Sequence, residues 1–275
     1  MLKQRLITGL ILAPIVLCGV FLLEQTYFAW FFGIVIALAG WEWANLSSFT
    51  SQAQRIVYAL IVCCLLYLIS SFSIEWILLT SVIWWFIATL CVLSFPDTKG
   101  LWASKPIRCL IGFVVLLPMW SALVFIRETD FIPAPGWGKL WVILYVLLMV
   151  WAADVGAYFS GKTWGNAKLA PKVSPGKSWA GAWGGIASTV ILALVAAYVL
   201  ELSSVLTIQL VVITIFTAII SIIGDLTESM FKRHRGIKDS SQLLPGHGGI
   251  LDRIDSLAAA IPVFVFLLLV LGWVA

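Results

Sequence analysis

The chain has 275 residues, of which 62% are hydrophobic and only 11% are charged, and its mean hydropathy is +1.06. These values exclude a water-soluble domain and are typical of an integral membrane protein. The net charge of +4 comes from bases scattered between apolar segments, which argues against a nucleic-acid partner. The five cysteines lie in or beside apolar runs without nearby histidines, so neither a disulfide framework nor a zinc site is indicated.

Apolar runs long enough to cross a bilayer recur along the whole chain. The first follows a basic start, as in a signal peptide, but it is about 18 residues long and lacks a small-residue cleavage site, so we expect a retained span. The sequence therefore predicts an all-α polytopic membrane protein with about nine transmembrane helices. The predicted spans are residues 6–23, 27–45, 55–71, 76–95, 108–126, 138–158, 179–200, 204–224 and 256–275.

Basic residues between these spans predict the orientation. With the N-terminus in the cytoplasm and the C-terminus on the opposite side, only Arg127 and Lys139 of the 17 Lys and Arg residues fall outside. The two longest loops, 159–178 and 225–255, then face the cytoplasm. We expect residues 1–130 to form a scaffold of about five spans, and residues 131–275 to form the catalytic region.

The first of these loops offers lysines beside glycines. Residues 156–163, "GAYFSGKT", fit a P-loop pattern, but a membrane helix precedes them and prolines follow, so we expect an accidental match. Lysines near exposed glycine backbone suit a polyphosphate, although they could equally enforce topology and contact anionic lipid headgroups. Lys177, in "SPGKS", is the strongest candidate for a functional role. The lysines concerned are Lys162, Lys168, Lys172 and Lys177.

Two acidic residues lie within predicted spans. Asp154 is about four residues inside the sixth span, where an ionisable group is costly unless it faces a partner or a wet cavity, so we expect a functional role. Glu42, between two tryptophans, could snorkel to the interface, and its role is left open.

Four acids flank the second loop. Asp225 and Glu228 are expected to end the eighth span, and Asp252 and Asp255 to begin the ninth. In each pair a three-residue spacing places both carboxylates on one face of a helix. Helix capping explains Asp252 and Asp255, but acids at a helix C-terminus oppose the helix dipole. The set therefore predicts a divalent cation, and oxygen ligands without His or Cys favour magnesium over zinc.

Bases and glycines lie between these acids. Bases, a metal cluster and a turn with exposed amide groups are the components of phosphate chemistry. His247 could donate to a phosphate or act as a general acid, and it could equally be a structural hydrogen-bonding group. The bases are Lys232, Arg233, Arg235 and Lys238, and the turn is "PGHGG".

The spacing of Gly181 and Gly185 is that of a G-x-x-x-G motif. Such a spacing lets two helices approach closely, so we expect a packing role within or between chains.

The segment Ser229–Asp255, "SMFKRHRGIKDSSQLLPGHGGILDRID", resembles the signature of the phosphatidate cytidylyltransferases, also called CDP-diacylglycerol synthases. Upstream, "ADVGAY", "KLAPKVSPGKS" and "GDLTES" are also similar to that family, so the resemblance covers about residues 150–260 closely.

The resemblance implies that phosphatidate and CTP give CDP-diacylglycerol and pyrophosphate, on the cytoplasmic side of a bacterial inner membrane. It also implies a homodimer and magnesium at Asp225, Asp252 and Asp255, to which we add Glu228, and it leaves open a potassium ion beside the magnesium. The predicted catalytic residues are Asp225, Asp252, Asp255, Lys232, Arg233, Lys238 and His247. The predicted substrate-binding residues are Asp154, Lys162, Ser174, Lys177, Gly246, Gly248, Gly249 and Arg253.

Direct attack of a phosphatidate oxygen on the α-phosphorus of CTP is the expected mechanism, because the attacking phosphate is already anionic and no covalent nucleophile is needed. Two alternatives stay open at this point. One is an ion-coupled transporter or flippase in which the acids bind the coupling ion, and the other is a CTP-dependent lipid kinase of the polyprenol type, which would release CDP instead of pyrophosphate.

Overall fold

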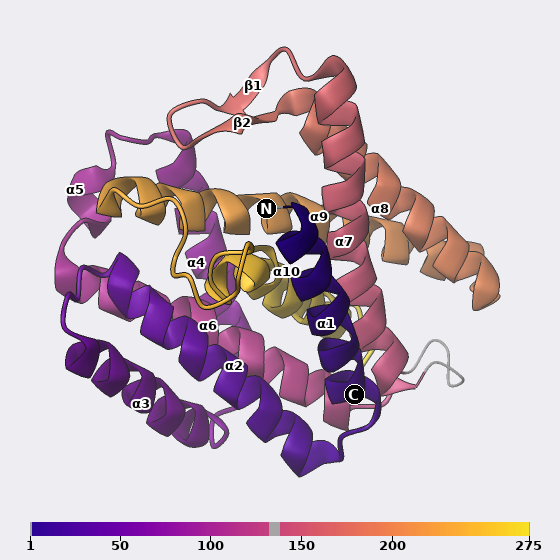
Figure 1. Cartoon of the computed structure of the whole chain (residues 1–275). Helices are drawn as coiled ribbons and strands as arrows, with labels where there is room; N and C mark the ends of the chain where they lie inside the picture. Colours follow the sequence, from indigo (N-terminus) through magenta and orange to yellow (C-terminus); the bar gives the residue numbers. More distant parts are fainter. Residues whose placement is uncertain (1, 132–137, 275) are drawn as a thin grey trace.

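A computed structural model gives the fold of the chain (Figure 1). It describes residues 2–131 and 138–274, with side chains from residue 8 onward. The helices are α1 (Leu2–Phe21), α2 (Gln25–Leu46), α3 (Gln52–Ile69), α4 (Ile74–Leu93), α5 (Lys99–Trp102), α6 (Lys105–Glu128), α7 (Lys139–Trp164), α8 (Trp179–Val199), α9 (Ser204–Arg235) and α10 (Leu251–Val270). A hairpin of two short antiparallel strands, β1 (Lys168–Ala170) and β2 (Ser174–Ser178), precedes α8.

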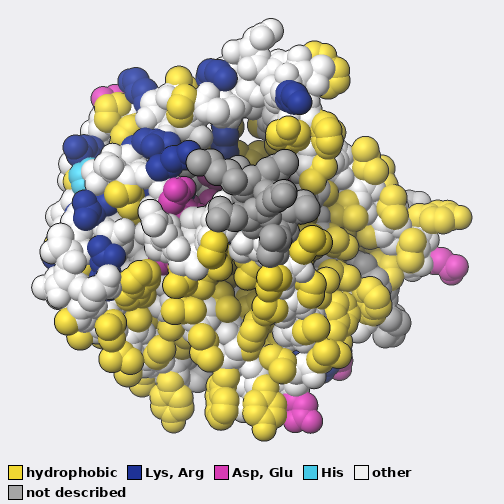
Figure 2. Space-filling view, viewed as in Figure 1, with side chains coloured by type: hydrophobic (Ala, Val, Ile, Leu, Met, Phe, Trp, Pro, Cys, Tyr) yellow, Lys and Arg dark blue, Asp and Glu magenta, His cyan; other side chains and the backbone are white. Residues whose placement is uncertain are grey.

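The helices confirm the predicted all-α polytopic fold. In the described part of the chain, eight helices are long and apolar enough to cross a membrane. Residues 8–21 of α1 form a shorter apolar helix; the predicted first span starts at residue 6, whose side chain lies outside the description. Hydrophobic side chains cover most of the visible surface, whereas Lys and Arg gather around one end, near the hairpin and the end of α9 (Figure 2). This separation suits a protein that spans a bilayer and presents its basic end to one aqueous side.

Helices α6 and α10 form the centre of the molecule. Both are largely enclosed by other helices, and α10 contacts α2, α4, α6, α7 and α9. From Leu257 onward α10 carries apolar residues on every face, as expected for a helix that is buried among other helices. One continuous hydrophobic core joins residues 20–274. The predicted scaffold and catalytic regions therefore pack as one body.

Small residues bring α7 and α8 together. A Cβ at Gly185 would lie 2.8 Å from the carbonyl oxygen of Ala153, and one at Gly181 would lie 3.1 Å from that of Ala157. Backbones can approach this closely only where no side chain intervenes. The G-x-x-x-G spacing thus serves packing within the chain, which is one of the two expected roles.

Helix α9 is longer than predicted. The apolar run stops near residue 224, but the helix continues to Arg235 and ends at Gly236, which has a left-handed φ of 75°. Asp225 and Glu228 therefore lie inside the helix, and the expectation that they oppose its C-terminal dipole is wrong. The last turn carries Lys232, Arg233, His234 and Arg235, charges that favour a helix C-terminus. The predicted loop 225–255 is correspondingly shorter.

The first predicted loop, 159–178, is also more ordered than expected. Helix α7 continues to Trp164, and the hairpin β1–β2 fills the rest of the segment up to α8. Ser178 ends β2 and caps α8, because its Oγ accepts a hydrogen bond from Gly181 N at 3.1 Å. The P-loop match lies entirely inside α7, so no phosphate-binding loop forms there, as expected.

Three arginines from different helices meet the C-terminal end of α2. Arg108 donates to the carbonyl oxygen of Leu46 and Arg235 to that of Asn45, both in the last turn of α2. The last carbonyl groups of a helix have no intrahelical partners and carry negative partial charge, so these two bases stabilise the helix end. Arg55 donates to the carbonyl oxygen of Phe49, just beyond the helix, and to the side chain of Asn45. These contacts fix α2 against α3, α6 and α9 beside the site.

Candidate active site

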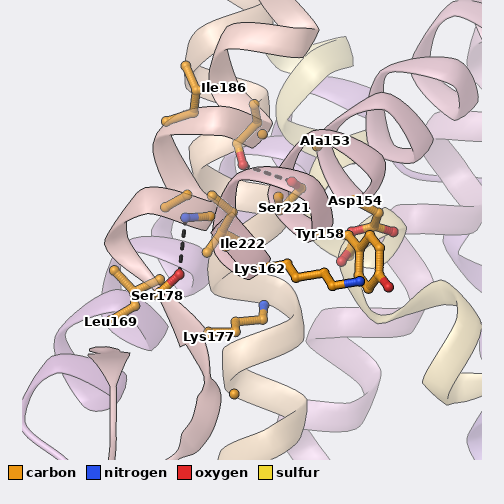
Figure 3. A pocket seen from close by; sticks show the side chains of 18 residues that line it. Ala153, Asp154, Tyr158, Lys162, Leu169, Lys177, Ser178, Ile186, Ser221 and Ile222 are labelled. Carbon is orange, nitrogen blue, oxygen red and sulfur yellow. Dashed lines mark hydrogen bonds between the residues drawn. The ribbon is translucent and has the colours of Figure 1, made fainter. Parts of the chain in front are cut away.

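A cavity of about 390 Å³ opens below the hairpin, between α7, α8 and α9. Its polar side carries Asp154, Tyr158 and Lys162 from α7, with Lys177 from β2 (Figure 3). The opposite wall is apolar and is formed by Leu169, Ile186, Ala218 and Ile222. Three predicted substrate-binding residues therefore line one cavity that has a charged side and an apolar side.

Lys177 joins the hairpin to α9. Its Nζ lies 2.7 Å from Oδ2 of Asp225, and both side chains are about a quarter to a third exposed (26% and 31%). Ser229, one turn later in α9, donates its hydroxyl proton to the other oxygen of Asp225 at 3.3 Å. Because the pair is partly solvated, Lys177 can exchange this carboxylate for another anion.

A second basic residue, Lys232, joins α9 to α10. Its Nζ lies 2.7 Å from Oε2 of Glu228 and 2.7 Å from Oδ1 of Asp252. All three side chains are nearly inaccessible, with 11%, 3% and 6% of their surface exposed. The contacts of Lys232 are those of a buried charge that holds two helices together, and its predicted catalytic role stays a prediction.

Asp252 accepts hydrogen bonds from the segment that precedes α10. Its Oδ2 accepts hydrogen bonds from the backbone of Ser240 at 2.9 Å, from the Ser240 hydroxyl at 2.9 Å and from Gly249 N at 2.7 Å. Both oxygens of Asp252 are therefore engaged. Asp252 lies in the first turn of α10, where its negative charge favours the helix dipole as expected, but the amide groups it accepts from precede the helix.

Asp255 lies between the two charge clusters. It interacts electrostatically with Asp225, Lys177 and Lys232, and its Oδ1 accepts a hydrogen bond from Ser256 N at 2.7 Å. Gly224 makes this proximity possible, since a Cβ there would lie 2.6 Å from the carbonyl oxygen of Asp255. The predicted pairs of acids thus meet across the α9–α10 contact.

The donor chemistry of this cluster suits magnesium. Glu228 Oε1 is buried and accepts no hydrogen bond, so it is an acceptor that a cation would satisfy. However, within residues 8–131 and 138–274 no three His, Cys, Asp or Glu side chains gather closely enough to bind an ion together. The set of Asp225, Glu228, Asp252 and Asp255 therefore stays a prediction. Of the four, Asp225 and Asp255 lie nearest the exchangeable Lys177.

A second, more polar cavity of about 750 Å³ lies at the glycine turn. The turn is tight because Gly246 and Gly248 have left-handed φ angles of 76° and 82°, which suit glycine. Arg253 donates to the carbonyl oxygen of His247 at 2.9 Å and interacts electrostatically with Asp154, which lines the first cavity. Arg253, at the first turn of α10, therefore links the second cavity electrostatically to the first. The predicted site residues that line the second cavity are Lys238, Gly246, His247, Gly248 and Arg253.

Three other predicted residues line neither of these two cavities. Ser174 begins β2, opposite Ala170 of β1. Arg233 donates its Nε proton to the carbonyl oxygen of Val173 at 3.2 Å, which links α9 to the hairpin. Gly249 is buried beside Asp252, to which it donates. Their direct contact with a substrate stays a prediction.

Sequence reasoning missed Glu42. Its side chain is completely buried, so it does not snorkel to the interface as considered above. Its carboxylate accepts hydrogen bonds from Ser241, Ile250 and Leu251, about 200 residues further along the chain. The only signal in the sequence is an acid between two tryptophans inside an apolar run, and this pattern does not indicate the partners.

Comparison with known proteins places this site in a family. The model of the cytidylyltransferase family matches residues 3–271, almost the whole chain. The chain therefore belongs to the cytidylyltransferase family, and it is an enzyme, a CTP-dependent nucleotidyltransferase.

Similar proteins carry a more specific name. The chain is 47% identical to a phosphatidate cytidylyltransferase of Pseudomonas aeruginosa over 276 residues, covering 99% of both chains. It is 39% identical to one of Haemophilus influenzae, covering 97% of this chain and 98% of the relative. It is 40% identical to one of Bacillus subtilis over 158 residues, covering 58% of each chain. The resemblance seen in the motifs therefore extends over the full length of the chain.

Proposed function

We propose that the chain is a phosphatidate cytidylyltransferase, which transfers CMP from CTP to phosphatidate and forms CDP-diacylglycerol and pyrophosphate in phospholipid biosynthesis. The observation that carries this proposal is the first cavity, where Lys162 and Lys177 face an apolar wall that includes Ile186 and Ile222. A lipid with a phosphate headgroup has the matching chemistry, an anion joined to an apolar body. Names of full-length relatives support the same substrate.

The reaction needs no protein nucleophile. A phosphatidate oxygen attacks the α-phosphorus of CTP, a new phosphorus–oxygen bond forms, and the bond to the β-phosphate oxygen breaks so that pyrophosphate leaves. Lys177 is the base best placed to hold the attacking phosphate, because it is partly exposed at the cavity and its present partner is a single carboxylate. Lys238 and Arg253 line the second cavity and supply the charge for the nucleotide phosphates.

We further propose that magnesium is the cofactor, held by Asp225 and Asp255 together with Glu228 and Asp252, with a potassium ion as an open addition. When bound, magnesium neutralises the triphosphate and stabilises the leaving pyrophosphate. The buried, unsatisfied oxygen of Glu228 and the approach of Asp255 to Asp225 support this assignment. Lys232 keeps Glu228 and Asp252 in place.

The proposed location is the bacterial inner membrane, with the active site toward the cytoplasm and with homodimeric assembly. The eight apolar helices and the basic end near the hairpin support the orientation. The dimer rests on the family resemblance alone.

The test is incubation of purified protein in detergent with phosphatidate, magnesium and CTP labelled at the α-phosphorus. We expect the label to enter the lipid with stoichiometric pyrophosphate release. Release of CDP with unlabelled lipid would identify a lipid kinase, and absence of CTP turnover together with ion-coupled lipid movement in vesicles would identify a transporter. Retention of configuration at the α-phosphorus would contradict direct attack, since a single displacement inverts it.

A further inference from the structure

We propose that Glu42 is a positioning residue for catalysis, acting from the N-terminal half of the chain on the glycine-turn segment, residues 236–250, and on the first turn of α10. This inference rests on the proposed role of that segment in binding the nucleotide. It assigns Glu42 no contact with substrate; its effect passes through the backbone that carries His247, Asp252 and Asp255.

The two ends of the segment converge on the Glu42 carboxylate. Oε1 accepts from the Ser241 hydroxyl at 2.5 Å and from Ile250 N at 3.0 Å. Oε2 accepts from Leu251 N at 2.6 Å and shares the Ser240 hydroxyl proton with Asp252 Oδ2, at 3.3 Å against 2.9 Å. One side chain of α2 therefore contacts both ends of the stretch from Ser240 to Leu251.

A carboxylate suits this position because every partner is a donor. The first amide groups of a helix lack intrahelical acceptors and favour negative charge, and Ile250, which precedes α10, supplies no side-chain cap. In the described part of the chain no Lys or Arg nitrogen lies within ion-pairing distance of Glu42. Three unshared donors and the helix dipole therefore favour the charged carboxylate, although the Asp252 carboxylate lies on the other side of the shared Ser240 hydroxyl.

Contacts of neighbouring residues fix α2 beside the glycine-turn segment. Trp43 packs on Phe231 of α9 with ring centroids 5.3 Å apart, and its Nε1 donates to the carbonyl oxygen of Arg108 at 2.8 Å. Asn45, on the same side of α2 as Glu42, donates to the carbonyl oxygen of Ser240 at 3.0 Å. A Cβ at Gly249 would overlap the Glu42 carboxylate, so the glycine is needed for this approach.

The experiment compares backbone amide exchange and turnover in Glu42→Gln, Glu42→Asp and two controls. Glu75→Gln makes the same chemical change at an exposed position of α4, and Leu78→Ala destabilises the core away from the segment. In Glu42→Gln we expect amide exchange in residues 240–251, without substrate, to rise about ten-fold or more, while exchange in α7 and α8 stays within about two-fold. The kcat/KM for CTP should fall by about the same factor. Glu42→Asp should recover part of both effects, since it keeps the charge.

The controls separate positioning from general stability. Glu75→Gln should match the wild type, and Leu78→Ala should lower the unfolding temperature without a selective rise in exchange at residues 240–251. If Glu42→Gln fails to fold, Glu42→Asp alone decides the matter by the same two measurements. Wild-type exchange in residues 240–251, wild-type turnover, or a uniform rise in exchange along the chain would each overturn the proposal. The exchange measurement uses no CTP, so it remains decisive even if the proposed reaction is wrong.

Discussion

Lys177 of the hairpin and Asp225 of α9 form an ion pair of 2.7 Å at the mouth of the first cavity. If Lys177 leaves Asp225 to bind a substrate phosphate, then Lys177→Ala should lower kcat/KM by about 10² to 10³ with little change in folding. Lys168→Ala, at an exposed position in β1, is the matched control and should retain activity. Phosphatidate-dependent CTP turnover and the thermal unfolding midpoint measure the two effects. Equal losses in both variants would remove Lys177 from the mechanism.

Lys232 should matter first for stability. Lys232→Met leaves Glu228 and Asp252 buried without their shared cation, which we expect to cost about 3–5 kcal/mol in the free energy of unfolding. Lys238→Met, at an exposed lysine six residues later, should leave the unfolding temperature unchanged. Thermal unfolding in detergent compares the two. A Lys232→Met protein as stable as the wild type would mean that the two carboxylates have other partners.

Magnesium dependence tests the acid cluster. Asp225→Asn and Asp255→Asn should raise the magnesium concentration needed for half-maximal turnover, because each substitution removes a charged ligand. Asp239→Asn, an exposed acid in the same segment, should titrate like the wild type. Asp252→Asn should also lower the unfolding temperature, since Asp252 holds Ser240 and Gly249. Unchanged magnesium titrations in all the variants would rule out this ligand set.

Gly224 controls the distance between α9 and α10. A Cβ at this position would meet the Asp255 carbonyl oxygen and the Ala259 side chain, so Gly224→Ala should push the helices apart. We expect a destabilisation of about 1–3 kcal/mol and a loss of turnover, because Asp225 and Asp255 then separate. Gly100→Ala, where nothing lies within 4 Å, should be neutral. Full activity of Gly224→Ala would show that the acids need not approach each other.

The orientation can be tested by labelling single cysteines in a cysteine-free background. Gln242→Cys, in the exposed glycine-turn segment, should react with a membrane-impermeant maleimide only after cells are opened. Ser203→Cys, in the turn between α8 and α9, should react in intact spheroplasts. The opposite pattern would invert the predicted topology.

Hydropathy predicted the apolar helices, but it placed the ends of α7 and α9 too early. In α9 the apolar run ends near Gly224, but Leu226, Met230 and Phe231 continue to pack against the core, and the helix follows them to Arg235. The window that detects membrane spans cannot recognise a helix that is buried on only one side. For the same reason the predicted span ended at residue 158, whereas α7 continues to Trp164.

Motif content in the sequence named the candidate residues, but it did not predict which of them form ion pairs and hydrogen bonds with each other. The spacing of the acids placed Asp225 and Asp255 in the cluster, but nothing in the order of Lys232 and Arg233 indicates that the first is buried between carboxylates while the second bonds to the hairpin. Which base lies inside depends on the rotation of α9 against α10, a property of tertiary packing. Glu42 was missed for the same reason.

The end of α2 has a consequence for recombination between relatives. Arg108 and Arg235 bind its last carbonyl groups, Arg55 binds the Asn45 side chain, and one turn earlier Glu42 binds the segment before α10. These contacts join α2 to helices on both sides of residue 130. A chimera that takes its first 130 residues from one relative and the remainder from another would have to match both sets of partners. Crossovers between α2 and α9 should therefore fail more often than a crossover between α1 and α2, which leaves α2 with all of these partners.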